Sequence, residues 1–227
     1  MAMQILMIKE GVDFESLFVN HGTDWPETYH YFDFFQDWLK REGHRPITVL
    51  KPEVEGFQVL YDFLKHWKIV PTMKHRTCTG KFKVRPVYKH VDKPCFMMIG
   101  IDAGESKRAK IATRKGIENR WPLIEYDIDR EGCKEIIKAA GIPVPKKSGC
   151  YICPFQRVGQ WKELRRVHPD LFCKAQRLEK LNMENNRKQG KRAYTLRSNG
   201  KSLGSVIDEK QIPIWEEDRY PPCECGL

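Results

Sequence analysis

The chain has 227 residues, of which 41% are hydrophobic and 11% aromatic, and it carries a formal net charge of +10. This length suits one sizeable domain or a domain with a small cap, and the apolar content is sufficient for a packed core. No apolar run approaches the roughly 18 residues that a membrane-spanning helix needs. The first residues carry no basic segment ahead of their apolar run, so they do not resemble a signal peptide. We therefore expect a cytoplasmic protein with no membrane partner.

Elements in the first part of the chain are expected to alternate between helix and strand. The pattern predicts a helix over 2–9, a strand over 16–20, a helix from about 26 to 42, a strand over 47–50 and a helix over 56–67. Asp24 can cap the second of these helices, whose first turn carries Pro26 and Glu27.

The rest of the chain continues the alternation and ends in helices. We expect a helix from about residue 80, a strand over 95–101, an extended piece over 121–126, a helix between Asp129 and Gly141, and two helices over 158–167 and 169–183. Strands alternating with helices predict an α/β fold with a mainly parallel sheet. We place an α/β domain at 1–146, and a helical, cysteine-containing cap and tail at 147–227.

Two polar loops follow predicted strands, and ligands of such sheets bind at the carboxyl ends of the strands. In the first loop, Gly22 lets the backbone approach a ligand, and Asp24 and Glu27 can take ribose hydroxyls or a metal. The alternative for Asp24 is helix capping. The second loop offers a phosphate or sulfate charge-assisted hydrogen bonds, or it is simply solvated. Its candidate residues are Glu105, Ser106, Lys107 and Arg108.

Basic residues are concentrated in two stretches. Residues 65–93 contain nine Lys or Arg and one acid, and residues 180–201 contain seven and one. Such stretches attract polyanions, which include both nucleic acid and phosphorylated nucleotides. Tyr194 is the one aromatic residue of the second stretch, and a single aromatic side chain offers little surface on which bases can stack. A solvated surface segment is the favoured interpretation there.

Eight cysteines in a reducing compartment favour metal ligands or catalytic thiols over disulfides. Cys150 and Cys153 in "SGCYICPF" form a tight C-x2-C turn that supplies half of a four-ligand site. Cys78, Cys223 and Cys225 are the natural partners, because they lie in polar or proline-rich segments. The other three are expected to be packing residues, and they are Cys95, Cys133 and Cys173. Zinc and an iron–sulfur cluster satisfy this spacing equally well.

Four segments, in order, carry a family likeness: "FVNHGTDWPET", "CTGKFKVRPV", "GIDAGESKRAK" and "WPLIEYDIDREGCKEIIKAAGIPVPKKSGCYICPFQ". Together they resemble the phosphoadenosine phosphosulfate (PAPS) reductase-like proteins of the adenine-nucleotide α-hydrolase superfamily. The resemblance implies a Rossmann-like (HUP-type) sheet that binds an adenine nucleotide, either ATP or a sulfonucleotide. It is closest to iron–sulfur-bearing bacterial and phage members.

The resemblance also implies a [4Fe–4S] cluster held by Cys78, Cys150 and Cys153. Family reductases have two adjacent cysteines where this chain has Thr77 and Cys78, so the fourth ligand is assigned to Cys223 or Cys225. The ending "ECGL" is similar to a motif whose cysteine attacks the sulfur of the nucleotide sulfate. That likeness makes Cys225 a candidate nucleophile, and a ligand pair is the alternative.

Two further features of the family bear on the nucleotide. Lys81 and Arg85 lie close to Cys78 in sequence, where they favour thiolate and can hold a sulfate or phosphate. The glycine-rich "SGGKDS" phosphate loop of the family is absent from this chain, together with the strand before it. A start placed too far downstream, a fragment and a natural loss are three accounts of that absence. A real loss would impair nucleotide chemistry.

Three functions follow from these observations. The first is an iron–sulfur enzyme that reduces an adenylyl sulfate or transfers sulfur, with a thioredoxin-like donor or a sulfur-donor protein as partner. The second is ATP-dependent thio-modification of DNA or tRNA, which the positive charge favours. The third is a non-catalytic module that holds a cluster or zinc. Homo-oligomerisation stays open in all three.

Overall fold

The computed structural model describes residues 1–111, 114–146, 149–197 and 199–207. The first elements are α1 (Ala2–Lys9), β1 (Leu17–Val19), α2 (Pro26–Arg41), β2 (Thr48–Leu50) and α3 (Leu60–Trp67). They are followed by η1 (Cys78–Val84, a π-helix), α4 (Arg85–His90), β3 (Cys95–Met98), η2 (Ala103–Arg108, a 3₁₀ helix), β4 (Ile117–Arg120), α5 (Pro122–Glu125) and α6 (Arg130–Ala139). The last elements are α7 (Val158–Val167), α8 (Pro169–Lys188) and η3 (Leu203–Ile207).

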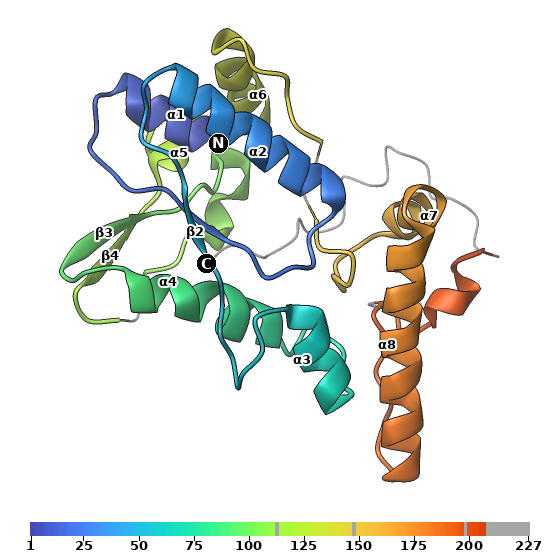
Figure 1. Cartoon of the computed structure of the whole chain (residues 1–227). Helices are drawn as coiled ribbons and strands as arrows, with labels where there is room; N and C mark the ends of the chain where they lie inside the picture. The colour runs from blue at the N-terminus through green and yellow to red at the C-terminus, as the bar shows by residue number, and fades with distance from the viewer. Residues whose placement is uncertain (112–113, 147–148, 198, 208–227) are drawn as a thin grey trace.

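All four described strands pair in parallel, as two separate two-stranded sheets. β1 pairs with β2, with Leu17 opposite Thr48, and β3 pairs with β4, with Cys95 opposite Ile117. Both sheets contribute to one hydrophobic cluster, in which Ile99 and Ile117 are packed against the partly buried Leu17 and other residues of the first pair. The predicted α/β character is therefore present, with helices around parallel strands (Figure 1).

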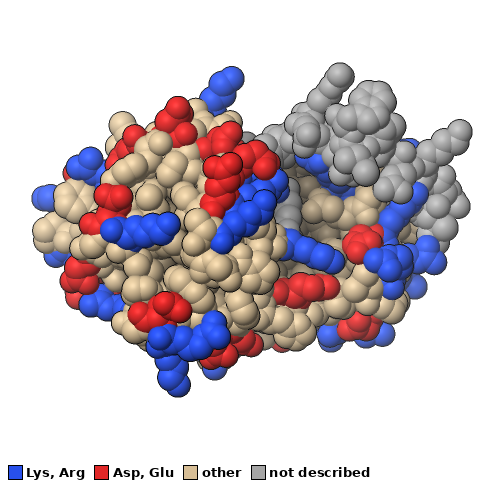
Figure 2. All heavy atoms as spheres, turned by 90° about the horizontal axis from the view of Figure 1, so that it is seen from above, with Lys and Arg blue, Asp and Glu red and all other residues tan. Residues whose placement is uncertain are grey.

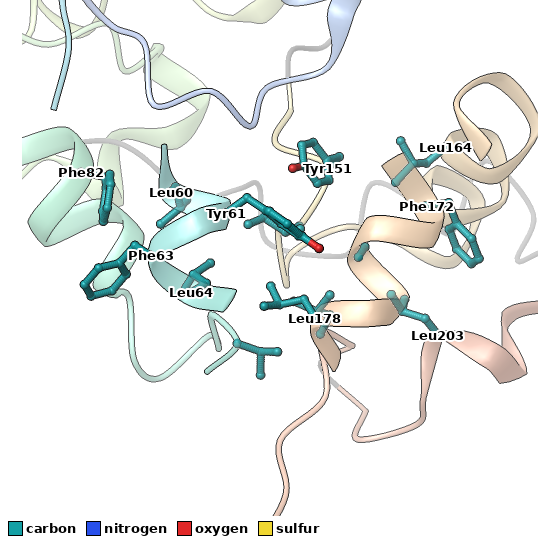
Figure 3. Close-up of a cluster of buried hydrophobic side chains, with 14 of the residues drawn as sticks. Leu60, Tyr61, Phe63, Leu64, Phe82, Tyr151, Leu164, Phe172, Leu178 and Leu203 are labelled. Atoms are coloured by element: carbon teal, nitrogen blue, oxygen red, sulfur yellow. The ribbon is translucent and has the colours of Figure 1, made fainter. Parts of the chain in front are cut away.

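The largest core cluster joins the helical cap to the rest of the molecule. Leu60 and Leu64 of α3 belong to the same buried cluster as Leu178 of α8. Tyr61 and Tyr151 lie between the two groups of side chains (Figure 3), with their ring centroids 6.2 Å apart. This core includes residues on both sides of the domain boundary that the sequence predicts at residue 146.

Two local predictions were wrong. Residues 121–126 were expected to be extended, but they contain α5, because Pro122 in the first turn suits a helix start and β4 ends just before it. Asp24 is not the N-cap residue of α2. Trp25 is the N-cap residue and makes no side-chain capping bond. By contrast, the Asp129 side chain does accept the backbone N–H of Gly132, at 2.9 Å, at the start of α6.

The second basic stretch is more ordered than a solvated segment. α8 continues to Lys188, and the chain then folds back so that Leu196 and Arg197 are buried. The buried Glu179 carboxylate accepts the backbone N–H groups of Leu196 and Leu203, at 3.0 and 2.8 Å.

On the face seen in Figure 2, basic and acidic side chains are interspersed. None of the helices in the described ranges has the length and apolarity that crossing a bilayer requires.

Candidate functional site

The loop after β1 and the cysteine turn, which are more than a hundred residues apart in sequence, meet through their backbones. Trp25 donates its N–H to the Gly149 carbonyl at 2.8 Å, and Tyr151 donates its N–H to the Thr23 carbonyl at 2.9 Å. Between them, Asp24 and Cys150 form an antiparallel β-bridge. The two segments that the sequence singled out for nucleotide and for metal therefore form one site.

A chain of polar side chains extends from the cysteine turn into the loop. The Cys150 thiol donates to the Thr23 hydroxyl, with 3.1 Å between Sγ and Oγ1. Thr23 Oγ1 lies 2.7 Å from His21 Nδ1, and His21 Nε2 lies 3.5 Å from an Asp24 carboxylate oxygen. Only 1% of His21 and none of Thr23 is exposed. Asp24, expected to face a ligand or cap a helix, thus lies beside the histidine, at a distance too long for a hydrogen bond to Nε2.

Burial sets the protonation of this chain of groups. Burial, followed by the positive charge of Lys83, lowers the pKa of His21 to about 3. Burial raises the pKa of the Cys150 thiol to about 12, although the Thr23 hydrogen bond opposes the rise. At neutral pH, His21 is therefore a neutral imidazole and Cys150 is a neutral thiol. A metal bound at Cys150 would have to displace that proton.

Local contacts fix the positions of Gly22 and Glu27. Gly22 has φ +73°, and a Cβ there would lie 3.1 Å from Val59 Cγ1, so the position favours glycine. Its N–H donates to the Asn20 side chain at 3.0 Å. The Glu27 carboxylate accepts from His168 Nε2 at 2.9 Å. Glu27 therefore ties the start of α2 to the junction of α7 and α8.

The predicted metal ligands are only partly brought together. Cys78 begins η1, and it packs against the same core cluster as Cys150. Cys153 is buried, and none of the six cysteines in the described ranges is in a disulfide. Within those ranges, no three His, Cys, Asp or Glu side chains form a group that could hold a metal ion. Cys223 and Cys225 lie outside the described residues, so the predicted four-ligand set is incomplete here.

Lys81 and Arg85 line a cationic pocket of about 320 Å³ at the carboxyl end of β2. The pocket also receives Lys51, which directly follows that strand, and Lys89. Lys81, Arg85 and Lys89 recur every four residues along η1 and α4, so they lie on one side of the helical segment. The acidic neighbours are few: Glu53 is in the lining, and a Glu55 oxygen lies 2.8 Å from Lys81 Nζ. This is an arrangement suited to a phosphate or sulfate.

The loop after β3 is arranged differently. Its residues form η2, in which Arg108 pairs with Glu105. Ser106 and Lys107 belong to the same turn, and none of these four residues lines the cationic pocket. η2 packs beside α5, so the structure keeps this loop apart from the pocket formed by Lys81 and Arg85.

Three residues of these sites were not predicted from the sequence: Thr23, Lys51 and Lys89. Thr23 was overlooked because nothing in the sequence links it to Cys150, from which it is far removed along the chain. Lys51 and Lys89 follow from rules already applied, since Lys51 leaves a strand end and Lys89 continues the spacing of Lys81 and Arg85. Two of the cysteines expected to be packing residues behave differently. Cys133 packs among apolar neighbours as predicted, but Cys173 is exposed on α8.

No protein-family model matches the chain, and neither a curated protein nor a solved structure matches it. Its function is therefore argued from the site and from the motifs in the sequence.

Proposed function

We propose that this chain is an iron–sulfur protein of the PAPS reductase-like family that uses an adenine nucleotide in sulfur chemistry. One observation carries the proposal: a single segment, η1 with α4, begins at Cys78 and then presents Lys81 and Arg85 to a cationic pocket. Cys78 packs against the same core as Cys150, whose turn is bonded to the loop after β1. One candidate ligand, Cys78, and the anion-binding residues Lys81 and Arg85 are thus within about two helical turns of each other.

The cationic pocket suits the sulfate or phosphate of a sulfonucleotide. Lys51, Lys81 and Arg85 would hold the anion and offset the charge that develops on a leaving phosphate. The family likeness assigns the attacking thiolate to Cys225. Attack on the sulfate sulfur would form an S–S bond, break the S–O bond and release AMP. A thioredoxin-like dithiol would then release sulfite, and its two thiols would end as a disulfide.

The proposed cluster ligands are Cys78, Cys150, Cys153 and one of Cys223 and Cys225, with zinc as the alternative metal. A bound [4Fe–4S] cluster would position the substrate and tune the neighbouring thiols. Thr23 would then act as a hydrogen-bonding neighbour of the Cys150 sulfur. The thiols in the described part are of the right chemical type, but Cys78, Cys150 and Cys153 do not form a three-ligand group there. Cluster binding would therefore have to draw these three together as well as recruit a tail cysteine.

A Rossmann-like sheet belongs to the same proposal. The two parallel pairs share one hydrophobic cluster, yet they are not joined by hydrogen bonds. A Rossmann-like arrangement would place these two parallel pairs side by side in one layer.

The test combines metal analysis with ligand binding. Protein purified without oxygen is expected to contain about four irons and four acid-labile sulfides per chain. Calorimetry with adenosine 5′-phosphosulfate and with AMP should show that the double substitution Lys81→Gln/Arg85→Gln weakens sulfonucleotide binding about tenfold or more. The control is Lys40→Gln/Lys138→Gln, on exposed positions of α2 and α6. One zinc without sulfide, or no binding of the sulfonucleotide, would contradict the proposal.

A further inference from the structure

A second basic groove lies on the helical cap, away from the cysteine turn. It has a volume of about 840 Å³, and it is formed by one side of α8 and by Lys191, Ala193, Ser202 and Gly204 of the segment that follows. The fold-back is fixed by polar contacts. Asn182 accepts the backbone N–H of Tyr194 at 3.1 Å, and Glu179 accepts the N–H groups of Leu196 and Leu203. The groove is therefore a preformed feature of the cap.

The rim of this groove is strongly positive. Arg177, Lys180, Arg187 and Lys191 line it, and all four are exposed. Of its two acids, Glu179 is buried and committed to backbone N–H groups, so it does not face a ligand. Glu184 lies 3.9 Å from Lys180, in an exposed pair that contributes little. The cations consequently exceed the acids available at the surface.

The floor of the groove is apolar. Met183, with 39% of its surface exposed, and Ala193 both line it. Tyr194 is not a lining residue, but it directly follows Ala193 in the chain and is 44% exposed. A single-strand binding site has two components. Cations bind the phosphate backbone, and an adjacent apolar and aromatic surface packs against the bases.

We propose that this groove binds single-stranded nucleic acid. At 1.5 Å per residue, Arg177 and Arg187 are separated by about 15 Å along α8. A linear polymer with one phosphate per nucleotide can meet several of the four cations at once, while one unpaired base packs on Met183 inside the groove and another on Tyr194 just outside it. A duplex keeps its bases stacked inside and would use only the cations. This inference does not depend on the proposed function, because the groove and the Lys81–Arg85 pocket share no residue.

The chain itself contains one competitor for the groove. Residues 208–227 hold six acidic and two basic residues, a net charge of −4, and they follow directly on η3. The groove residues Ser202 and Gly204 lie only a few positions earlier. The experiment must therefore separate binding of nucleic acid from occupation by this acidic segment.

The test measures fluorescence anisotropy of labelled 20-nucleotide oligo-dT and oligo-rU with the full chain, as a function of salt. Arg187→Gln/Lys191→Gln should weaken binding about tenfold, and it should reduce the slope of log affinity against log salt by about two. Lys40→Gln/Lys138→Gln is the matched control. It also removes two positive charges, but it should leave both the affinity and the salt slope nearly unchanged. Tyr194→Ala should weaken binding severalfold while leaving the salt slope unchanged, since it removes stacking and no charge.

Three results would overturn the proposal. The first is equal weakening by the groove and control pairs, which would indicate nonspecific charge. The second is equal affinity for a 20-base-pair duplex. The third is an unchanged salt slope in Arg187→Gln/Lys191→Gln, because the phosphates would then not contact the groove cations. A rise in affinity when Glu216→Gln, Glu217→Gln and Asp218→Asn are combined, abolished by adding Arg187→Gln/Lys191→Gln, would support the groove as the shared binding site. A preference between the DNA and RNA oligomers would identify the natural class of strand.

Discussion

The Cys150 site and the Lys81–Arg85 pocket differ in the solvent exposure of their side chains. The Cys150 site is dry: Thr23 and His21 are buried, and the thiol and the imidazole are both neutral. The pocket is open to solvent: Lys81 keeps 41% of its side chain exposed, and its Nζ lies 2.8 Å from a Glu55 carboxylate oxygen. The dry site depends on packing between distant segments, whereas the pocket depends mostly on helical spacing. Substitutions should therefore affect stability at the first and ligand binding at the second.

The largest effect should come from removing the packing below the cysteine turn. Ile152 has no exposed surface, so Ile152→Ala should lower the free energy of unfolding by about 2–5 kcal/mol. Val144→Ala, at a position 36% exposed, should change it by less than about 0.5 kcal/mol. Urea unfolding measures both. Similar losses for the two variants would contradict the view that the turn is seated on a rigid core.

Thiol reactivity reports directly on the dryness of the site. In metal-free protein at pH 8, Cys150 should react with iodoacetamide at least about 100-fold more slowly than Cys173, because the thiolate is the nucleophile. Cys150 is buried with a pKa raised to about 12, whereas Cys173 is exposed. Mass spectrometry after timed alkylation measures both rates. Comparable rates would show that water reaches Cys150.

Thr23→Val keeps the shape of the side chain and removes its hydroxyl. The buried His21 Nδ1 would lose its 2.7 Å partner, at a cost of about 1–3 kcal/mol in unfolding free energy. Thr48→Val is the control, because the Thr48 hydroxyl donates to Glu15 at an exposed site and should be worth less than about 1 kcal/mol. Chemical denaturation compares them. An unchanged stability for the Thr23 variant would show that its hydroxyl is dispensable.

The smallest effect is expected at the contact between Glu27 and His168. Burial alone would raise the pKa of Glu27, but its backbone hydrogen bond and His168 lower it below its usual range. The stabilisation from this lowered pKa is present above the usual value of 4.5 and is lost as pH falls through the lower folded pKa. Glu27 is 41% exposed, so His168→Ala should cost less than about 1 kcal/mol at pH 6.

The pH profile supplies the control for that variant. Unfolding curves between pH 6 and the acid limit should show the difference from the parent chain shrinking as Glu27 becomes protonated. Glu131→Gln removes an exposed pair with Lys134 on α6 and should leave the profile nearly unchanged. A His168→Ala penalty that persists after Glu27 is protonated would mean that packing of His168 against Trp25, and not the pairing, is responsible.

Local patterns were sufficient for most of the elements. Helix periodicity and a proline in the first turn located α2, and Asp129 located the start of α6. The extended assignment of 121–126 failed because apolar runs of this length are compatible with strand or helix. In the site, the cysteine turn and the basic residues after Cys78 were visible in the sequence because their spacing is short.

The sequence by itself determined the residue chemistry: paired thiols at Cys150 and Cys153, cations that repeat along one helical side, and an α/β alternation. Tertiary structure alone decided which of these meet. It joined Thr23 to Cys150, turned Glu27 toward His168 and separated Arg108 from the pocket. The physical reason is that spacing along the chain fixes only neighbours within a few residues. Contacts between distant segments depend on how their apolar faces pack.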